Sequence, residues 1–168
     1  MNVDRRARGF TLIELLVVIA IIGILSATVL VSLNTARGKA RDAKRLSDIR
    51  QVATALQLYY LDNGRYPIRA GWMGTTPGCY GGLANPNDVI PGLVPKYLPS
   101  MPQDPSPSGS YCYLYTTSST NGTDYKFLVY NTVESKTPAP GQPNARYSLG
   151  CGSAQRSFAV YSEDARCW

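Results

Sequence analysis

The sequence predicts an α+β fold in which one long amino-terminal helix, membrane-spanning in its first half, packs on a small antiparallel β-sheet head. Two observations lead to this prediction. No proline precedes Pro67, and an apolar run followed by a helical period fills that interval. Short segments of strand composition, separated by turn signals, follow only after residue 110. A helical region followed by a strand region is typical of α+β proteins.

Residues 10–33 form an apolar run of membrane length with a single charge, Glu14. At ~1.5 Å per residue the run reaches roughly 36 Å, enough to cross a bilayer with some tilt. Basic residues precede it, which predicts a cytoplasmic amino terminus and places everything after Leu33 outside. The run is too long for the apolar region of a secretory signal peptide. A plain membrane anchor would leave Glu14 unexplained.

The helical period continues beyond the span, so we expect one helix from about Thr11 to Leu61. Asn63 and Gly64 can cap it, and Pro67 prevents it from resuming. One face of residues 34–63 is predicted to be apolar, with charges mainly elsewhere. Its members are Leu46, Ile49, Val52, Ala53, Leu56 and Tyr60.

The net charge of the 168-residue chain is +6, and much of it lies within residues 37–50. Asp42 and Asp48 dilute this basic cluster, which consists of Arg37, Lys39, Arg41, Lys44, Arg45 and Arg50. Such a cluster can bind nucleic acid or acidic lipid headgroups. We favour a solvated helix face that carries ion pairs.

The four cysteines are confined to the predicted head: Cys79, Cys112, Cys151 and Cys167. An even number beyond the membrane indicates disulfides in an oxidising compartment. Proximity in sequence favours Cys79–Cys112 and Cys151–Cys167, but three connectivities remain open. No CxxC pair occurs, so we expect no zinc site.

The rest of the head, residues 64–168, divides into a loop and a sheet. Residues 64–110 are rich in glycine, proline and asparagine and read as a long loop, with room for a short helical turn. The sheet is expected within 111–168, in strands at 111–117, 125–131, 146–150 and 157–162. Asn121-Gly122 is a hairpin-turn signal between the first two strands, although with Thr123 it also matches a glycosylation sequon.

The stretch RGFTLIELLVVIAIIGIL, residues 8–25, resembles the class III leader and amino-terminal helix of type IV pilins and pseudopilins. The resemblance implies that residues 1–9 are a cytoplasmic leader. A prepilin peptidase would cut between Gly9 and Phe10 and methylate the new amino terminus. It also implies that residues 10–33 become the core of a filament. Many family members carry a proline near residues 31–33. This chain does not, which leaves Gly38 as the candidate hinge.

Glu14 is the fifth residue of the mature chain that this cleavage would produce. A charge on a membrane helix is costly without a partner. A neighbouring copy, staggered along the axis, could bring its α-amine to the Glu14 carboxylate, so that each charge neutralises the other. The alternative is a carboxylate that reaches back to the cytoplasmic interface. Gly23 and Ala27 form a small-xxx-small pair that permits close helix approach.

No catalytic residues, cofactor or metal site are expected. The chain has no histidine, and its acids outside the membrane are scattered through loops. Asp124, Glu163 and Asp164 could hold calcium only if they met in space, and they match no recognisable calcium loop. Tyr111, Tyr113 and Tyr115 alternate and would share one sheet face, where we expect them to cover the core or form an exposed sheet surface rather than stack on bases.

The sequence therefore indicates a structural subunit of a type IV pilus-like surface filament, in which copies of the chain assemble through their helices. The segments QLYYLDNGRYP (57–67) and YLPSMPQDP (97–105) resemble major pseudopilins of type II secretion, which is the alternative. A DNA-uptake pilin is the second alternative. The resemblance implies a prepilin peptidase, an assembly ATPase and an inner-membrane platform as partners. The chain would be a single-pass membrane protein before assembly and a surface or periplasmic filament afterwards.

Overall fold

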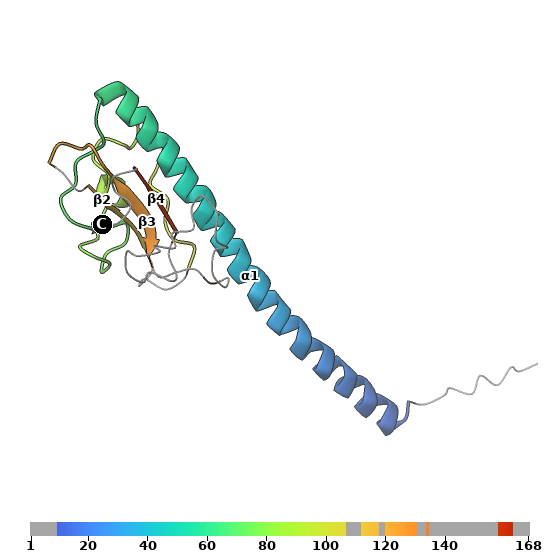
Figure 1. The fold of residues 1–168 in the computed structure, drawn as a ribbon. Coiled ribbons are helices and arrows are strands. Elements are labelled where there is room, and N and C mark those ends of the chain that lie inside the picture. The colour runs from blue at the N-terminus through green and yellow to red at the C-terminus, as the bar shows by residue number, and fades with distance from the viewer. Residues whose placement is uncertain (1–9, 107–111, 118–119, 131–133, 135–157, 163–168) are drawn as a thin grey trace, which may run out of the picture. The chain divides into compact units, whose positions relative to one another are not determined.

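The computed structural model describes residues 10–106, 112–117, 120–130, 134 and 158–162. The fold is α+β, as predicted, with one long helix and an antiparallel four-stranded sheet (Figure 1). In chain order the elements are α1 (Leu12–Asn63), β1 (Met73–Gly74), the 3-10 turn η1 (Pro86–Asp88), β2 (Cys112–Thr116), β3 (Lys126–Tyr130) and β4 (Phe158–Tyr161). The chain divides into two compact units, Met1–Arg37 and Gly38–Trp168.

The helix α1 ends with the predicted cap. Gly64 adopts a positive φ of 68°, and its N–H donates to the Tyr60 carbonyl oxygen at 2.8 Å. This hydrogen bond belongs to the left-handed capping motif, which favours glycine because a side chain would strain that backbone conformation. The Asn63 side chain caps the last turn as well, since its Nδ2 donates to the Tyr59 carbonyl oxygen at 2.8 Å.

The first half of α1 carries the apolar run. An 18-residue window within α1 has a mean hydropathy of 2.8, and by length and composition alone the helix can cross a membrane. No residue of that window is buried. The large apolar side chains from Phe10 to Leu33 are all exposed, from 41% at Leu33 to 78% at Phe10. None of the residues that the structure describes covers this surface.

The second half of α1 packs along the sheet, but its buried face differs from the predicted one. Ile49, Val52 and Leu56 are fully buried, as expected. Tyr60, predicted to be on this face, is 39% exposed. Most charged side chains of residues 34–63 lie outside this face, as predicted, but the face also buries Asp42, Arg45 and Asp48. These charges tolerate burial because they are paired with one another and with residues of the head, as described below.

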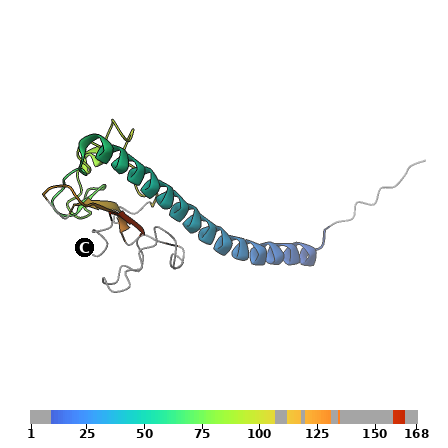
Figure 2. The same ribbon diagram turned by 45° about the horizontal axis from the view of Figure 1, so that its top comes forward.

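The sheet has the order β1-β2-β3-β4, and every neighbouring pair is antiparallel. Figure 2 shows the strands on one side of the second half of α1. In the central pair of strands, Leu114 of β2 lies opposite Leu128 of β3. On the other side of β3, Ala159 of β4 lies opposite the same leucine. The strands β2, β3 and β4 lie within predicted segments. The strand β1 was not predicted, because two residues are too few to show an alternating pattern. The expected strand at 146–150 lies outside the described residues.

Both faces of the central strands are covered. On the helix side, Tyr113 and Tyr115 of β2 and Phe127 and Val129 of β3 join the core that Ile49 and its neighbours form. The alternation expected for Tyr113 and Tyr115 is therefore confirmed, and both side chains belong to the core. Their hydroxyl groups are satisfied within it: that of Tyr115 donates to the Pro67 carbonyl oxygen at 2.7 Å. On the opposite face, Cys112 and Leu114 pack with partly buried side chains, namely Trp72, Leu128 and Tyr130.

The connection between β2 and β3 is longer than the expected hairpin turn at Asn121-Gly122. The strand β2 ends at Thr116, whereas β3 begins at Lys126. Gly122 has a φ of 68°, and its carbonyl oxygen accepts the Tyr66 N–H at 2.7 Å. A Cβ at this position would lie 2.4 Å from the Tyr66 carbonyl oxygen. The glycine therefore serves close packing against the segment that follows α1 rather than a two-residue turn.

Cys79 and Cys112 form a disulfide that joins the loop after β1 to the start of β2. This is one of the two pairs that proximity in sequence favours. Cys151 and Cys167 lie outside the described residues, so their pairing stays a prediction.

Replacing both Cys79 and Cys112 with serine is expected to lower the free energy of unfolding of the head by about 2–4 kcal/mol, because the bond constrains the unfolded chain. The 33-residue separation of the pair is enough for such an effect. Urea unfolding of the full chain in detergent, followed by near-UV circular dichroism, measures the change. An unchanged urea midpoint of unfolding would show that the disulfide between the loop 75–82 and β2 contributes nothing to the stability of the head.

Candidate assembly site

Glu14 takes part in a capping box at the start of α1. The Thr11 N–H and hydroxyl donate to Glu14 Oε2 at 2.9 and 2.8 Å. In return, the Glu14 N–H donates to the Thr11 hydroxyl oxygen at 3.2 Å. This reciprocal pattern satisfies amide groups that the first turn of a helix leaves without intrahelical partners. The acid therefore has a local role in the single chain that sequence reasoning did not consider, although Thr-x-x-Glu is a recognisable signal.

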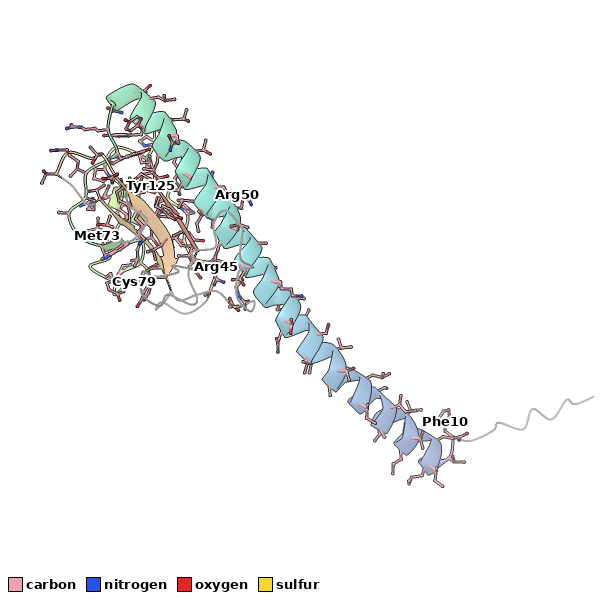
Figure 3. All side chains as sticks on the ribbon, in the orientation of Figure 1. Phe10, Arg45, Arg50, Met73, Cys79 and Tyr125 are labelled. Atoms are coloured by element: carbon pink, nitrogen blue, oxygen red, sulfur yellow. A yellow bond between two sulfur atoms is a disulfide. The ribbon has the colours of Figure 1, made fainter. Side chains whose placement is uncertain are left out.

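The capping box leaves part of the Glu14 carboxylate available. Both hydrogen bonds from Thr11 end on Oε2, and none of the hydrogen bonds between described residues uses Oε1. A carboxylate can accept several hydrogen bonds, so a second donor can be accommodated. Glu14 and Phe10 are both exposed at the start of the apolar run, and Figure 3 shows Phe10 at that end of α1. Gly9 lies outside the described residues.

The small residues of the span lie in the open. An added Cβ at Gly23 would meet nothing within 4 Å, and Ala27 is exposed. Among the residues that the structure describes, neither packs against anything that requires a small side chain. Their size therefore matters for an interaction outside the described structure, or not at all.

The second polar site is a buried ion-pair cluster around Arg45, whose side chain is completely inaccessible to solvent. Its Nε and Nη2 donate to the two oxygens of Asp104 at 2.8 and 2.9 Å, a two-pronged geometry that favours arginine over lysine. Its Nη1 donates to Asp42 at 2.7 Å and to Glu134 at 3.1 Å. Figure 3 shows Arg45 on the side of α1 that faces the head, and Arg50 on the other side.

The cluster extends to both sides of Arg45. The Arg41 Nε donates to Glu134 at 2.7 Å, and the backbone N–H of Glu134 donates to Asp42 at 3.1 Å. On the other side, Asp48 accepts from Lys44 and, at 2.7 Å, from the buried hydroxyl of Tyr113. These contacts tie α1 to three distant parts of the head: the loop at Asp104, strand β2, and the segment after β3.

The pKa values in the cluster follow from this pairing. Burial opposes the charge of Asp104, but hydrogen bonds from Arg45 and Ser106 outweigh it and hold the pKa of Asp104 below its usual value of 3.8. The hydrogen bond from Arg41, aided by Arg45, likewise lowers the pKa of Glu134. Burial would lower the pKa of Arg45, yet Asp104 and Asp42 raise it overall. All three groups are therefore charged at neutral pH.

Gly38 takes part in this packing, and its role as a hinge stays a prediction. It is buried within α1, and an added Cβ would lie 3.4 Å from the Cβ of Glu134. The α1 helix shows no break at this position. A small residue here lets the segment that carries Glu134 approach the helix.

In the part of the chain that the structure describes, no three or more histidine, cysteine, aspartate or glutamate residues are placed to hold a metal ion. Asp124 accepts a hydrogen bond from the Ser162 hydroxyl at 3.2 Å. Glu163 and Asp164, which would complete the calcium hypothesis, lie outside the described residues.

A helix that opens on a capped acid, exposes an apolar half of membrane length and carries a small antiparallel sheet on its second half is the organisation of a pilin-like protein. Comparison with known sequences agrees with this class. The family model of the prokaryotic N-terminal methylation motif matches residues 4–30. No solved structure matches the chain.

Relatives extend the match from the helix into the head. The chain is 38% identical over 110 residues to the type II secretion system core protein G of Dickeya chrysanthemi, covering 61% of this chain and 65% of that protein. It is 39% identical over 107 residues to the protein of the same name from Aeromonas hydrophila, covering 60% and 68%. For the Vibrio cholerae protein of that name the identity is 34%, covering 62% and 69%.

The chain spans about two thirds of the length of these curated relatives. It belongs to the pilin and pseudopilin family, and within it to the family of the type II secretion system core protein G.

Proposed function

We propose that this chain is a pseudopilin, a structural subunit of the filament of a type II secretion system. The observation that carries the proposal is the length of the match to type II secretion core proteins. The methylation motif ends at residue 30 and is common to pilins and pseudopilins, whereas the relatives match over 102 to 110 residues in the longer alignments. The comparisons therefore favour the secretion alternative over the surface pilus that the sequence analysis placed first.

Processing is proposed to begin the assembly. A prepilin peptidase would cut between Gly9 and Phe10 and methylate the amine of Phe10. The leader 1–9 would remain in the cytoplasm, and the head would lie in the periplasm. Residues 10–33 would hold the processed chain in the inner membrane until it joins the filament.

Assembly would move the apolar half of α1 from lipid into a bundle of identical helices. Apolar contacts with lipid are then exchanged for apolar contacts with protein, so the hydrophobic effect supplies little net driving force. Glu14 would provide axial register through the amine of a neighbouring Phe10, with Oε1, which accepts no hydrogen bond from the described residues, as the acceptor. An assembly ATPase, acting through an inner-membrane platform, would supply the energy.

The proposal is tested by locating the processed chain in the native cell. Intact mass and amino-terminal sequencing should give a chain that begins at Phe10 and carries one additional methyl group. A pseudopilin should remain with the cell envelope and form cross-linked ladders there, and its deletion should block export of secreted proteins. Abundant processed chain in material sheared from the cell surface, with secretion unaffected by the deletion, would instead identify a surface pilus.

Gly23 offers a test of helix packing in the filament. Replacement with leucine is expected to reduce cross-linked filament by roughly tenfold or more, because close approach of packed membrane helices requires small residues. The single chain should be unaffected, since no described atom outside the local helix backbone lies within 4 Å of the new Cβ position. Quantitative cross-linking in membranes measures the loss. The matched control is Ser32→Leu, which introduces the same side chain on the opposite side of the helix, and equal losses in both variants would contradict a specific role for Gly23.

A further inference from the structure

The structure divides the basic cluster of residues 37–50 into two sets. Arg41, Lys44 and Arg45 form ion pairs with acids of α1 or of the head. The other three, Arg37, Lys39 and Arg50, are exposed, and they form no ion pair among the residues that the structure describes. The expectation of a solvated face laced with ion pairs therefore accounts for only part of this cluster.

Two of the unpaired cations stand directly after the apolar run. Arg37 and Lys39 follow Leu33 by four and six residues in the same helix α1. At ~1.5 Å per residue this is roughly 6 and 9 Å along the helix. The polar headgroup layer of a bilayer is about 5–8 Å deep on each side of the hydrocarbon core. With residues 10–33 in the hydrocarbon, the flexible side chains of Arg37 and Lys39 reach this layer.

Processing would change which basic residues lie nearest to the apolar run. They would lie on its cytoplasmic side before cleavage and on the side of the head after it. Before cleavage, Arg5, Arg6 and Arg8 flank it on the cytoplasmic side. After cleavage behind Gly9, no basic side chain precedes the span, and the nearest ones are Arg37 and Lys39. This step rests on the proposed function, whereas the exposure of the two cations does not.

We propose that Arg37 and Lys39, which lie on nearly opposite sides of α1 because they are two residues apart, form a clamp that binds headgroups of anionic phospholipids around the helix, in the leaflet on the side of the head. Among the described residues, the acids near the two cations already have partners. Asp42 and Asp48 are buried and paired with Arg45 and Lys44, and Glu134 is paired with Arg41 and Arg45. Cations beside a membrane attract acidic lipids, and their long aliphatic stems extend readily toward the interface. The clamp fixes the depth of the processed chain in the membrane and holds it there until assembly extracts it.

The experiment uses the full chain reconstituted into phosphatidylcholine vesicles that contain spin-labelled lipid. Electron spin resonance of phosphatidylglycerol and phosphatidylcholine probes gives the preference of the protein-contacting lipid shell for the anionic headgroup. We expect the wild type to prefer phosphatidylglycerol, and the double variant Arg37→Gln with Lys39→Gln to lose roughly half or more of that preference. The leader arginines are present in both proteins, so the difference between them reports the clamp alone.

Arg50→Gln is the matched control. Arg50 is exposed and unpaired like the other two, but it lies 17 residues beyond Leu33, outside the headgroup layer. Its replacement should leave the lipid preference unchanged. At about 1 M salt, where the screening length is ~3 Å, the difference between the wild type and the double variant should shrink.

Equal lipid preference in the wild type and the double variant would overturn the proposal. So would an equal loss in the Arg50 variant, because the effect would then be one of net charge. If the double variant keeps its lipid preference but loses cross-links between copies, the two cations serve subunit contact instead. None of these outcomes depends on cleavage or secretion, so failure of the clamp and failure of the proposed function are distinguishable.

Discussion

Replacing Arg45 with methionine is expected to destabilise the head by about 3–5 kcal/mol, the range found when one partner of a buried ion pair is removed. Methionine is similar in length and fills much of the same space. It leaves Asp42 and Asp104 buried without the guanidinium that neutralises them, and it removes one of the two cations that pair with Glu134. Since small domains are stable by only about 5–15 kcal/mol, this loss is a large fraction of the total stability of the head.

Urea unfolding of the full-length protein in detergent, followed by near-UV circular dichroism of the buried tyrosines, measures this loss. Arg50→Met is the matched control. It removes the same kind of side chain from the same helix, but from an exposed position, and should change stability by less than about 0.5 kcal/mol. Similar unfolding midpoints for the Arg45 variant and the wild type would mean that the cluster contributes nothing net to the fold.

The pH dependence of stability gives a second readout. The folded protein holds the pKa of Asp104 and Glu134 below their usual values of 3.8 and 4.5. Between those values and the lower folded ones, the unfolded chain binds more protons than the folded chain. The stability of the wild type should therefore fall as the pH decreases below about 4.5, through the folded pKa values. The Arg45 variant should show a weaker decrease, because its carboxylates have lost much of the stabilisation of their charged forms.

The sequence predicted those parts of the fold that local pattern determines. The helix was expected from about Thr11 to Leu61 and runs from Leu12 to Asn63. Its capping residues, its apolar half and the positions of β2 and β3 were also readable, because hydrophobic period, glycine and proline act within a few residues. The alternation of Tyr113 and Tyr115 correctly placed both on one face of the sheet, and the structure shows that this is the core face.

The Arg45 cluster could not be predicted from the same patterns. Its partners Asp104 and Glu134 lie 59 and 89 residues away in sequence, so no local period connects them. A hydrophobicity pattern assigns any charge to solvent, although Asp42, Arg45 and Ile49 are spaced three and four residues apart on one face. That spacing is a weak signal, because it indicates which charges face the head but not which residues neutralise them.

Replacing Glu14 with glutamine is expected to reduce filament formation by roughly tenfold or more while leaving the start of α1 intact. Glutamine can serve at the third position of a capping box, so the hydrogen bonds from Thr11 are retained. What is lost is the negative charge. A neighbouring amine brought to this position in the membrane would then remain uncompensated, and the register that the charge pair selects would lose its advantage over neighbouring registers.

Two variants separate the local role of Glu14 from its role between copies. Glu14→Ala removes both the capping box and the charge, whereas Thr11→Val removes the hydroxyl of the capping box and keeps the charge. If charge pairing controls assembly, cross-linked filament in membranes should be equally low for glutamine and alanine at position 14 and closer to wild type for Thr11→Val. If capping controls it, the glutamine variant should assemble normally and the other two should fail. Circular dichroism of each purified variant checks that the helix persists, so that loss of filament reflects the contact between subunits rather than the fold of one.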